Sequence, residues 1–384
     1  MKDNTIVTHA GSRPFENHGI VNPPVYHAST VLQPTMEALL NRGSAKVRYG
    51  RRGTPTTFAL EEAVSALEGA HGTILAPSGL AAITMTLSAL LETGDHILIT
   101  DSTYAPTRNF AINILAKLGI EAEFYDPNTG AGIAALIRSN TRLIWAESPG
   151  SQTFEVQDMP AIVAAAHAAD VLVAMDNTWA GGYFYKPLHH GVDISVQAAT
   201  KYIVGHSDVM MGTIACNEAT YERVKEATGF YGLCCGPDDV YLALRGLRTI
   251  GVRMDRHHEN GLRLANWLRE RPEVTQIMHP GLAGDPGHDL WQRDFSGASG
   301  LFGFVLKDDK RTKIAALLDG LELYGMGSSW GGYESLILPN WPENNRTATQ
   351  WSPGGQSMRV HVGLEDIDDL IADLEAGLAR YNAA

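Results

Sequence analysis

Short apolar runs alternate with helical periodicity between about residues 53 and 246. The apolar runs lack regular polar positions, which is typical of strands buried on both faces of a sheet. Strands are expected at Thr73–Ala76, His96–Thr100, Ala122–Tyr125, Leu143–Glu147, Val171–Asp176 and Ile194–Ala198. Helices are expected between them at Thr57–Leu67, Ala81–Leu91, Asn109–Leu118 and Ala161–Ala168. This alternation predicts an α/β domain whose sheet is mainly parallel.

The chain before this domain has no sustained period and contains several prolines and glycines. Residues 1–52 are therefore expected to form an extended arm, with one short helix near Thr35–Asn41. An arm without a core of its own usually packs on another body, so we expect it to contact a neighbouring subunit.

The alternation of strands and helices ends at about residue 247, and a different pattern begins there. It comprises a polar helix over Arg253–Glu270, a strand over Gly303–Leu306 and a last helix over Ile367–Tyr381. These elements predict a smaller α+β domain. The expected organisation is an arm (1–52), a large α/β domain (53–246) and a C-terminal α+β domain (247–384).

The composition excludes several classes of protein. Lys and Arg number 30 against 43 Asp and Glu, and the net charge of −13 argues against nucleic acid or an anionic membrane as the main partner. Apolar residues make up 44% of the chain, which excludes a disordered or collagen-like protein. The three cysteines form neither a disulfide framework nor a Cys-x-x-Cys zinc motif. With no apolar run long enough for a membrane span or a signal segment, a cytoplasmic protein is expected.

Candidate chemistry follows the expected strands, because functional groups in open α/β sheets gather at the carboxyl ends of the strands. Ser78, Gly79 and Leu80 open a helix, where backbone amides can bind an anion, although Ser78 is equally suited to cap the helix. Tyr104 follows the second strand and suits either stacking on a flat ligand or a half-buried structural position. No glycine-rich fingerprint of a dinucleotide or P-loop site is present.

Asp176 and Lys201 follow two later strands. A carboxylate that ends a buried strand is costly unless paired, so Asp176 either makes a structural cap or ion pair or meets a metal or a protonated ring nitrogen. A buried lysine has a lowered pKa and becomes a nucleophile; the alternative for Lys201 is a charged end that reaches water. Lys186 is the rival lysine, but Tyr185-Lys186-Pro187 predicts a surface turn.

An anion site, a tyrosine, a carboxylate and a lysine at four strand ends together match what pyridoxal phosphate requires. The lysine forms a Schiff base, the carboxylate keeps the pyridine nitrogen protonated, the amides hold the phosphate and the aromatic ring covers the cofactor. The sequence therefore predicts pyridoxal 5'-phosphate as cofactor and no metal. The histidine pairs His189-His190 and His257-His258 are expected to be solvated or capping, and Cys234-Cys235 to be structural.

The chain resembles the Cys/Met-metabolism family of pyridoxal-phosphate enzymes over nearly its whole length. The motifs that carry the resemblance are QAATKYIVGHSD at 197–208, MDNTWA at 175–180 and SWGGYES at 329–335. The Ser-Trp-Gly-Gly pattern and RVHVGLED at 359–366 indicate the branch that acts at the β carbon of cystathionine. Relatives that act at the γ carbon usually differ at the Trp330 position and have serine at the His361 position. The resemblance implies the PLP-dependent transferase fold of the aspartate-aminotransferase type (type I).

The resemblance also implies roles for individual residues. Lys201 would be the Schiff-base lysine and the base for the α-proton, Asp176 would pair with the pyridinium, and Tyr104 would stack on the ring and assist proton transfer. The expected phosphate ligands are the amides of Gly79 and Leu80, the Thr200 hydroxyl, and Tyr49 and Arg51 of a neighbouring subunit. Arg359 would bind the substrate carboxylate, in a pocket also lined by Ser329 and Trp330.

The implied activity is β-elimination of L-cystathionine to homocysteine, pyruvate and ammonia in methionine biosynthesis, extending to cystine and other cysteine conjugates. The implied assembly is a homotetramer built as a dimer of dimers. Two positions depart from the family pattern: Ala198 replaces a serine that touches the phosphate, and Ser328 replaces a tyrosine usual in the nearest β-acting relatives. The alternatives are a γ-acting relative (a cystathionine γ-synthase or γ-lyase) and a non-catalytic protein on the same scaffold.

Overall fold

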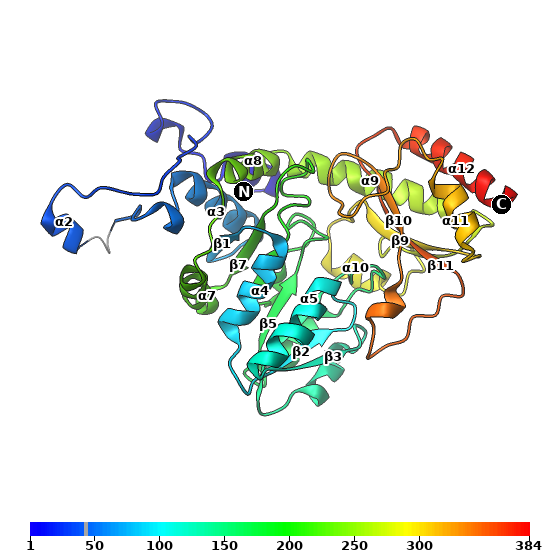
Figure 1. Ribbon diagram of the computed structural model, residues 1–384, viewed down its shortest axis with the longest axis horizontal. Coiled ribbons are helices and arrows are strands. Elements are labelled where there is room, and N and C mark those ends of the chain that lie inside the picture. The colour runs from blue at the N-terminus through cyan, green and yellow to red at the C-terminus, as the bar shows by residue number, and fades with distance from the viewer. Residues whose placement is uncertain (42–44) are drawn as a thin grey trace.

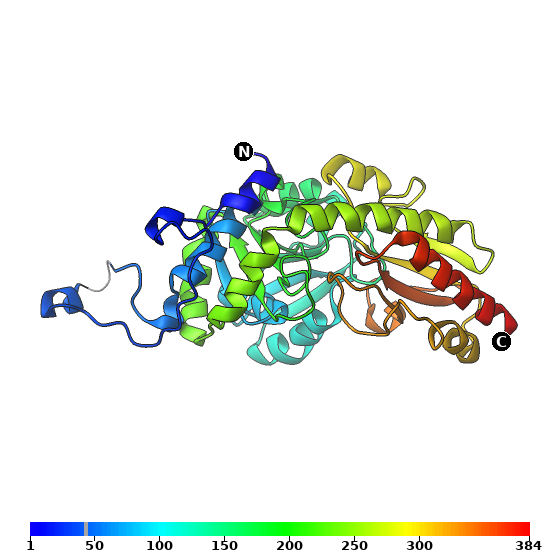
Figure 2. The same ribbon diagram turned by 90° about the horizontal axis from the view of Figure 1, so that it is seen from above.

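Two β-sheets form the frame of the protein, and the long helix α9 (Ile250–Arg269) runs from one to the other (Figures 1 and 2). The computed structural model describes residues 1–41 and 45–384. The large sheet has seven strands and the smaller sheet has four. The expectation of an α/β fold with a mainly parallel large sheet and a smaller α+β part is confirmed.

The large sheet has the strand order β1-β7-β6-β5-β4-β2-β3. Its strands are β1 (Gly72–Ala76), β2 (His96–Thr100), β3 (Glu121–Tyr125), β4 (Thr141–Glu147), β5 (Leu172–Asp176), β6 (Ile194–Gln197) and β7 (Gly212–Cys216). The strands from β6 to β3 pair in parallel, so the carboxyl ends of β2, β4, β5 and β6 meet at one edge. This edge carries the candidate site.

Strand β7 was not predicted, and it runs antiparallel to both of its neighbours. It joins β6 through a loop rather than through a crossover helix, so the alternation of strand and helix that reveals the other strands is missing here. Its five residues are all buried. Because β7 lies between β1 and β6, the first strand of the sheet pairs with the last one.

Six helices cover the two faces of the large sheet. They are α3 (Pro55–Glu68), α4 (Gly79–Leu90), α5 (Ala105–Phe110), α6 (Met159–His167), α7 (Glu218–Tyr231) and α8 (Pro237–Leu247). Buried side chains of α3, α6 and α8 form one apolar core with the sheet, and those of α4 and α7 form another on the opposite face. Successive residues of β1 alternate between these cores, Leu75 in the first and Ile74 and Ala76 in the second, as the pleat of a strand requires.

The smaller sheet is antiparallel throughout, with the order β10-β11-β9-β8. Its strands are β8 (Val274–Met278), β9 (Leu301–Leu306), β10 (Leu336–Pro339) and β11 (Gln356–His361). Its helices are α10 (His288–Asp294), α11 (Arg311–Leu318) and α12 (Ile367–Ala383). The expected strand at 303–306 and the two long helices are present. The other three strands of this sheet and helices α7, α8, α10 and α11 were not predicted.

The N-terminal segment has two parts that behave differently. Helix α1 (Asp3–His9) packs against α3, with Val7 buried in the core, so its residues belong to the body rather than to an extended arm. Beyond it the chain projects away from the body, through the short helix α2 (Met36–Leu40) that the sequence predicted (Figures 1 and 2). Phe15, Leu32 and Leu40 are exposed on this projecting part.

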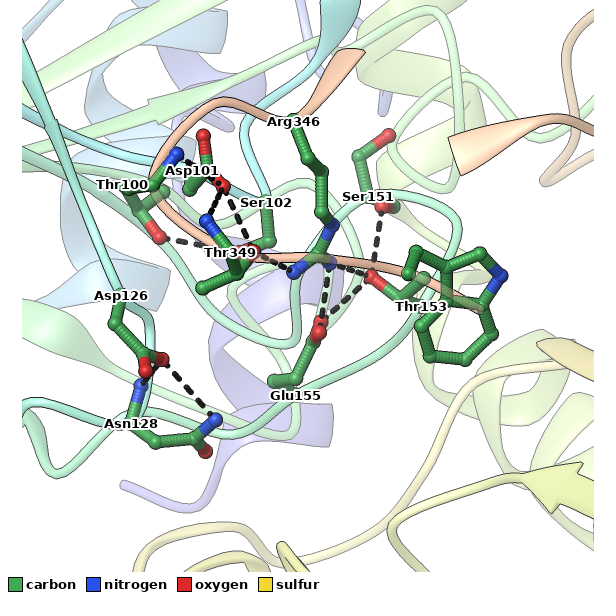
Figure 3. A network of polar contacts seen from close by, with 12 residues as sticks. Thr100, Asp101, Ser102, Asp126, Asn128, Ser151, Thr153, Glu155, Arg346 and Thr349 are labelled. Carbon is green, nitrogen blue, oxygen red and sulfur yellow. Dashed lines mark hydrogen bonds and ion pairs between the residues drawn. The ribbon is translucent and has the colours of Figure 1, made fainter. Parts of the chain in front are cut away.

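A buried carboxylate fastens the loop between β10 and β11 to the large sheet (Figure 3). Asp101, directly after β2, accepts hydrogen bonds from the backbone amides of Thr347, Ala348 and Thr349 at 2.8–3.3 Å. Its Oδ2 also accepts the Thr349 hydroxyl at 2.7 Å, and its Oδ1 forms an ion pair with the buried Arg108 of α5. Beside it, Arg346 forms an ion pair with Glu155 at 2.6 Å. We call the contacts of Asp101 with residues 347–349 the Asp101 clasp.

No helix in the described part of the chain is both long and apolar enough to cross a membrane.

Candidate active site

Lys201 lies in a turn after β6, at the edge where the strand ends of the large sheet face the smaller sheet. Its Nζ donates a hydrogen bond to Ser329 Oγ at 2.5 Å and lies 5.3 Å from the ring centre of Trp330. Burial and the charge of Arg359 together lower the pKa of Lys201 to about 8, although the charge of Asp176 opposes the shift. The structure thus supplies an amine that is partly neutral near physiological pH.

The rival lysine has a structural position. Lys186 Nζ donates to Asp3 Oδ1 at 2.9 Å and to the carbonyl of Leu67, which ties helix α1 to α3. Lys186 therefore holds the N-terminal helix in place and does not reach the edge of the sheet where Lys201 lies.

The segment from Ser329 to Gly332 is held tightly against Lys201. Ser329 has φ of +92°, a strained conformation for a residue with a side chain. A Cβ on Gly331 would come within 2.9 Å of the Lys201 backbone, so only glycine allows this approach. The Gly331 amide donates to Nε2 of the buried His361 at 3.2 Å. His361 thereby fixes the turn that presents Ser329 and Trp330 to the lysine.

Asp176 ends β5 as a buried carboxylate, which matches the sequence expectation. Its Oδ1 accepts the amide of Thr178 at 2.9 Å and the Thr178 hydroxyl at 2.5 Å. The same hydroxyl accepts the amide of Ala198 at 2.9 Å. Burial raises the pKa of Asp176, while the bonds from Thr178 and the charge of Lys201 lower it. A carboxylate oriented in this way suits a cationic partner such as a protonated ring nitrogen.

Tyr104 lies at the start of α5, and its backbone amide donates to Glu147 Oε2 at 2.6 Å. Burial raises the pKa of the Tyr104 phenol, and the charges of Glu147 and Asp176 raise it further. Arg359, on β11, has the opposite effect on this phenol and donates to the Ser329 carbonyl at 3.3 Å. Tyr104, Asp176, Lys201 and Arg359 therefore belong to one electrostatic cluster.

Glu147 was not identified from the sequence as a site residue. It is the last residue of β4, and its carboxyl stands next to that of Asp176 because the two residues are register partners. The signal was available, since Glu147 also ends an apolar run with a carboxylate. Sequence reasoning missed Glu147 because it is the last residue within its strand, whereas functional groups were expected directly after the strands.

The start of α4 forms a tight cradle. Ser78 Oγ accepts the amide of Ala81 at 3.0 Å, so Ser78 does cap the helix. A Cβ on Gly79 would come within 2.4 Å of the Ala198 Cβ, so a larger residue cannot bring this helix end against the segment before Lys201. Leu80 lies beside it, partly exposed. A phosphate role for these amides remains a prediction.

Thr200 makes two hydrogen bonds with Met211 through its side chain. Its hydroxyl donates to the Met211 carbonyl at 3.1 Å and accepts the Met211 amide at 2.9 Å. The hydroxyl therefore already joins the turn before Lys201 to the segment entering β7. A further bond to phosphate stays a prediction.

Tyr49 and Arg51 are not brought to Lys201 within one chain. Arg51, in the turn Gly50–Arg52, donates to the Gly229 carbonyl of α7 at 2.8 Å. Figure 1 shows α7 on the side of the molecule from which the arm projects. Tyr49 is exposed. Action of both residues in the site of a neighbouring subunit stays a prediction.

The other candidate groups have structural positions. His257 is buried and its Nδ1 contacts the Val362 carbonyl at 2.8 Å, while His258 Nδ1 accepts the Ala298 amide at 2.9 Å. Within residues 1–41 and 45–384, no group of three or more His, Cys, Asp or Glu side chains is placed to hold a metal ion. Burial raises the pKa of Cys235 to about 12, which makes this thiol a poor nucleophile.

The arrangement fits pyridoxal phosphate on three counts. A buried carboxylate is available for a cationic ring nitrogen, an amine with a lowered pKa is available for an aldehyde, and a helix start that only glycine permits is available for a phosphate. When bound at this site, the cofactor supplies an electron sink for charge that develops at the α carbon of an amino acid.

Comparison with known proteins agrees with this assignment. The sequence profile of the family described as Cys/Met metabolism PLP-dependent enzyme matches residues 4–379. The chain is similar to cystathionine beta-lyase MetC of Escherichia coli, with 45% identity over 99% of this chain and 98% of that protein.

Solved structures are similar over the full length. The structure of metB from Corynebacterium glutamicum has a TM-score of 0.90 and 31% identity, covering 100% of this chain and 99% of that one. The structure of cystathionine gamma-lyase from Lactobacillus plantarum, complexed with L-serine, has a TM-score of 0.91 and 29% identity, with full coverage of both chains. The fold is thus that of these PLP enzymes, as the sequence predicted. The chain belongs to the family of Cys/Met metabolism PLP-dependent enzymes, and its cofactor is pyridoxal phosphate.

Proposed function

We propose that this enzyme is a carbon–sulfur β-lyase that converts L-cystathionine and water to homocysteine, pyruvate and ammonia, a step of methionine biosynthesis. The observation that carries the proposal is the cluster in which Lys201 bonds to Ser329 and Arg359 bonds to the backbone of the same residue. The similarity to the Escherichia coli protein named cystathionine beta-lyase MetC supports it. Cystine and other cysteine conjugates are further candidate substrates, since the reaction requires only a sulfur leaving group on the β carbon.

Each residue of the cluster has a definite task in this proposal. The Arg359 guanidinium binds the α-carboxylate of the substrate through two parallel hydrogen bonds. The Lys201 amine, with its pKa lowered to about 8, removes the α-proton, and Ser329 Oγ orients that amine. The phenol of Tyr104 keeps its proton at neutral pH and can donate it to the departing sulfur. Asp176 holds the cationic end of the cofactor ring.

The second candidate function is cleavage or replacement at the γ carbon. The similarity to the solved Lactobacillus plantarum cystathionine gamma-lyase favours keeping this alternative. A γ reaction requires removal of a second proton, from the β carbon, and we would assign that step to Lys201 as well. The side chains of the cluster are compatible with both reactions, so the product must decide.

Cofactor-loaded enzyme incubated with L-cystathionine is expected to release pyruvate and homocysteine in equal amounts. The keto acid is identified by chromatography. The Lys201→Ala variant at equal cofactor concentration measures the reaction caused by free cofactor, and this background is subtracted. Release of 2-oxobutyrate and cysteine would replace the β-lyase proposal by a γ-lyase. Absence of any keto acid from cystathionine and cystine alike would contradict both.

We further propose that the enzyme assembles as a homotetramer, a dimer of dimers, in which Tyr49 and Arg51 complete the phosphate site of a neighbouring subunit. The projecting part of the N-terminal segment exposes large apolar side chains, which a second copy would cover. Arg51 is held at α7, on the side of the chain that carries this projection. Sharing of the site would explain why residues of the arm are separated from Lys201 within one chain.

Hybrids of inactive Arg51→Ala and inactive Lys201→Ala subunits are expected to regain up to about half of wild-type activity per dimer, because one of the two sites is then intact. Activity is measured after mixing, with tagged subunits to isolate the hybrids. The matched control pairs Asp176→Asn with Lys201→Ala; both residues come from one chain, so no intact site forms. Inactive Arg51/Lys201 hybrids would contradict sharing.

A further inference from the structure

Glu147 is a second carboxyl beside Asp176. The two residues end β4 and β5 as register partners, so their side chains leave the sheet on the same face, from strands about 4.8 Å apart. Glu147 Oε2 accepts the Tyr104 amide at 2.6 Å and the Thr103 hydroxyl at 3.2 Å. Glu147 therefore joins the end of β4, beside Asp176, to the turn that carries Tyr104.

The surroundings of the two carboxyls differ in charge. Both hydrogen-bond donors to Glu147 are neutral, whereas the charge of Lys201 favours the anionic form of Asp176. Burial raises the pKa of Glu147 well above its usual range, and the charge of Asp176 raises it further. Burial also raises the pKa of Asp176, but the two bonds from Thr178 and the Lys201 charge lower it. Ionising both of two adjacent carboxyls is costly because the two negative charges repel each other. One of the pair therefore keeps its proton, and it is the one without a nearby cation to stabilise its anionic form.

We propose that Glu147 and Asp176 act as one carboxyl pair, in which Glu147 keeps a proton and Asp176 keeps the negative charge. A neutral Glu147 does not compete with Asp176 for the cationic ring nitrogen of the cofactor. It still accepts the Tyr104 amide, so it is a positioning residue for the ring of Tyr104. Tyr104, Lys201 and Arg359 are the other ionisable groups of this cluster, and none of them bonds to the Glu147 carboxyl through its side chain.

This pairing concerns cofactor binding and is independent of the bond that the enzyme cleaves. Two substitutions separate the effects of charge and position. Glu147→Gln keeps a neutral side chain with an acceptor oxygen, and Glu147→Ala removes the acceptor. Apoenzyme carrying Glu147→Gln is expected to bind pyridoxal phosphate within about threefold of the wild-type Kd. Glu147→Ala is expected to weaken binding by about tenfold or more, because the Tyr104 amide loses its partner.

Infrared spectroscopy of the apoenzyme detects the proton itself. At neutral pH, the difference spectrum of wild type minus Glu147→Gln is expected to contain the carbonyl band of a protonated carboxylic acid. Burial also raises the pKa of Glu68, and that of Glu61 to about 8, but both contribute equally to the two proteins and cancel. Glu155→Gln is the matched control, because Glu155 forms an ion pair with Arg346. The spectrum of wild type minus Glu155→Gln is therefore expected to lack the carbonyl band of a protonated carboxylic acid.

Two results would overturn the pairing. One is a difference spectrum without the band, which would mean that Glu147 is ionised. The other is a Glu147→Gln apoenzyme that binds the cofactor as weakly as Glu147→Ala, which would mean that the negative charge is required. Neither result alters the identity of the keto acid released from cystathionine, so failure here is distinguishable from failure of the proposed function.

Discussion

Replacement of Lys201 by alanine is expected to lower kcat by about 10⁴-fold or more. The amine has two tasks in the proposed reaction, attachment of the cofactor and transfer of the α-proton, and no other lysine reaches this edge of the sheet within the described residues. Its contact with Ser329 and its lowered pKa both depend on burial at this position. The loss should therefore exceed that caused by removal of any residue that only binds substrate.

Steady-state turnover of cystathionine at saturating cofactor measures this effect. The matched control is Lys117→Ala, which removes an exposed lysine and should leave turnover unchanged. A small primary amine such as methylamine, added to Lys201→Ala, should restore part of the rate if the deficit is a missing amine rather than a misfolded site. Turnover of Lys201→Ala within tenfold of wild type would show that another group performs both tasks.

Asp101→Asn is expected to destabilise the protein by about 3–5 kcal/mol, because it leaves the buried Arg108 without its anion. The substitution also weakens the Asp101 clasp, whose three amides are donors to a charged acceptor. The loop between β10 and β11 should then detach from the large sheet more readily. The effect is measured as a shift in the midpoint of urea unfolding at neutral pH.

The pH dependence of this effect follows from the carboxylate. Burial alone would raise the pKa of Asp101, but the hydrogen bonds from residues 347–349 outweigh it and the net pKa is lowered. A carboxyl with a lowered pKa in the folded state stabilises the protein above its unfolded pKa, and the gain is lost as the pH falls through the folded value. The difference in the free energy of unfolding between wild type and Asp101→Asn should thus be constant near neutral pH. It should become smaller only below about pH 4.

The exposed Asp126 provides the control for this experiment. Its carboxylate accepts hydrogen bonds from the neighbouring Asn128, as Figure 3 shows, and Asp126→Asn should shift the midpoint of urea unfolding little. Two results would contradict the stabilising role of the Asp101 clasp. One is an equal loss of stability in Asp101→Asn and Asp126→Asn, and the other is a stability difference between wild type and Asp101→Asn that stays the same in acid.

Lys201 and Asp176 could be found from the sequence because each interrupts an apolar run with a charge, and a charge is costly inside a sheet. The central parallel strands β2, β4, β5 and β6 could be found because their runs of buried apolar residues stand out in the sequence. Strand β3 was predicted as well, although most of its residues are exposed or half-buried. Strand β7 could not be found, because it follows β6 without the helix that marks a parallel crossover. The strands β8, β10 and β11 belong to an antiparallel sheet. They are short and separated by long irregular segments, so their hydrophobic pattern does not stand out in the sequence.

The arm illustrates a different limit. Its lack of periodicity predicted an extended segment, and the part beyond α1 does project from the body. Helix α1 was missed because its seven residues bury only Val7, which is too little to produce a visible apolar stripe. Tyr49 and Arg51 were assigned through family resemblance alone, and a single chain contains no contact between them and Lys201 that would replace it.

The position of β1 also governs the order in which a growing chain can mature. β1 pairs with no strand except β7 in the large sheet, and Gly79, just behind β1, packs on Ala198. In a nascent chain that ends before residue 212, the first strand therefore has no partner strand in the large sheet. β1 can join the sheet only after nearly all of the large sheet has left the ribosome, and until then its exposed edge is where a chaperone would be most useful.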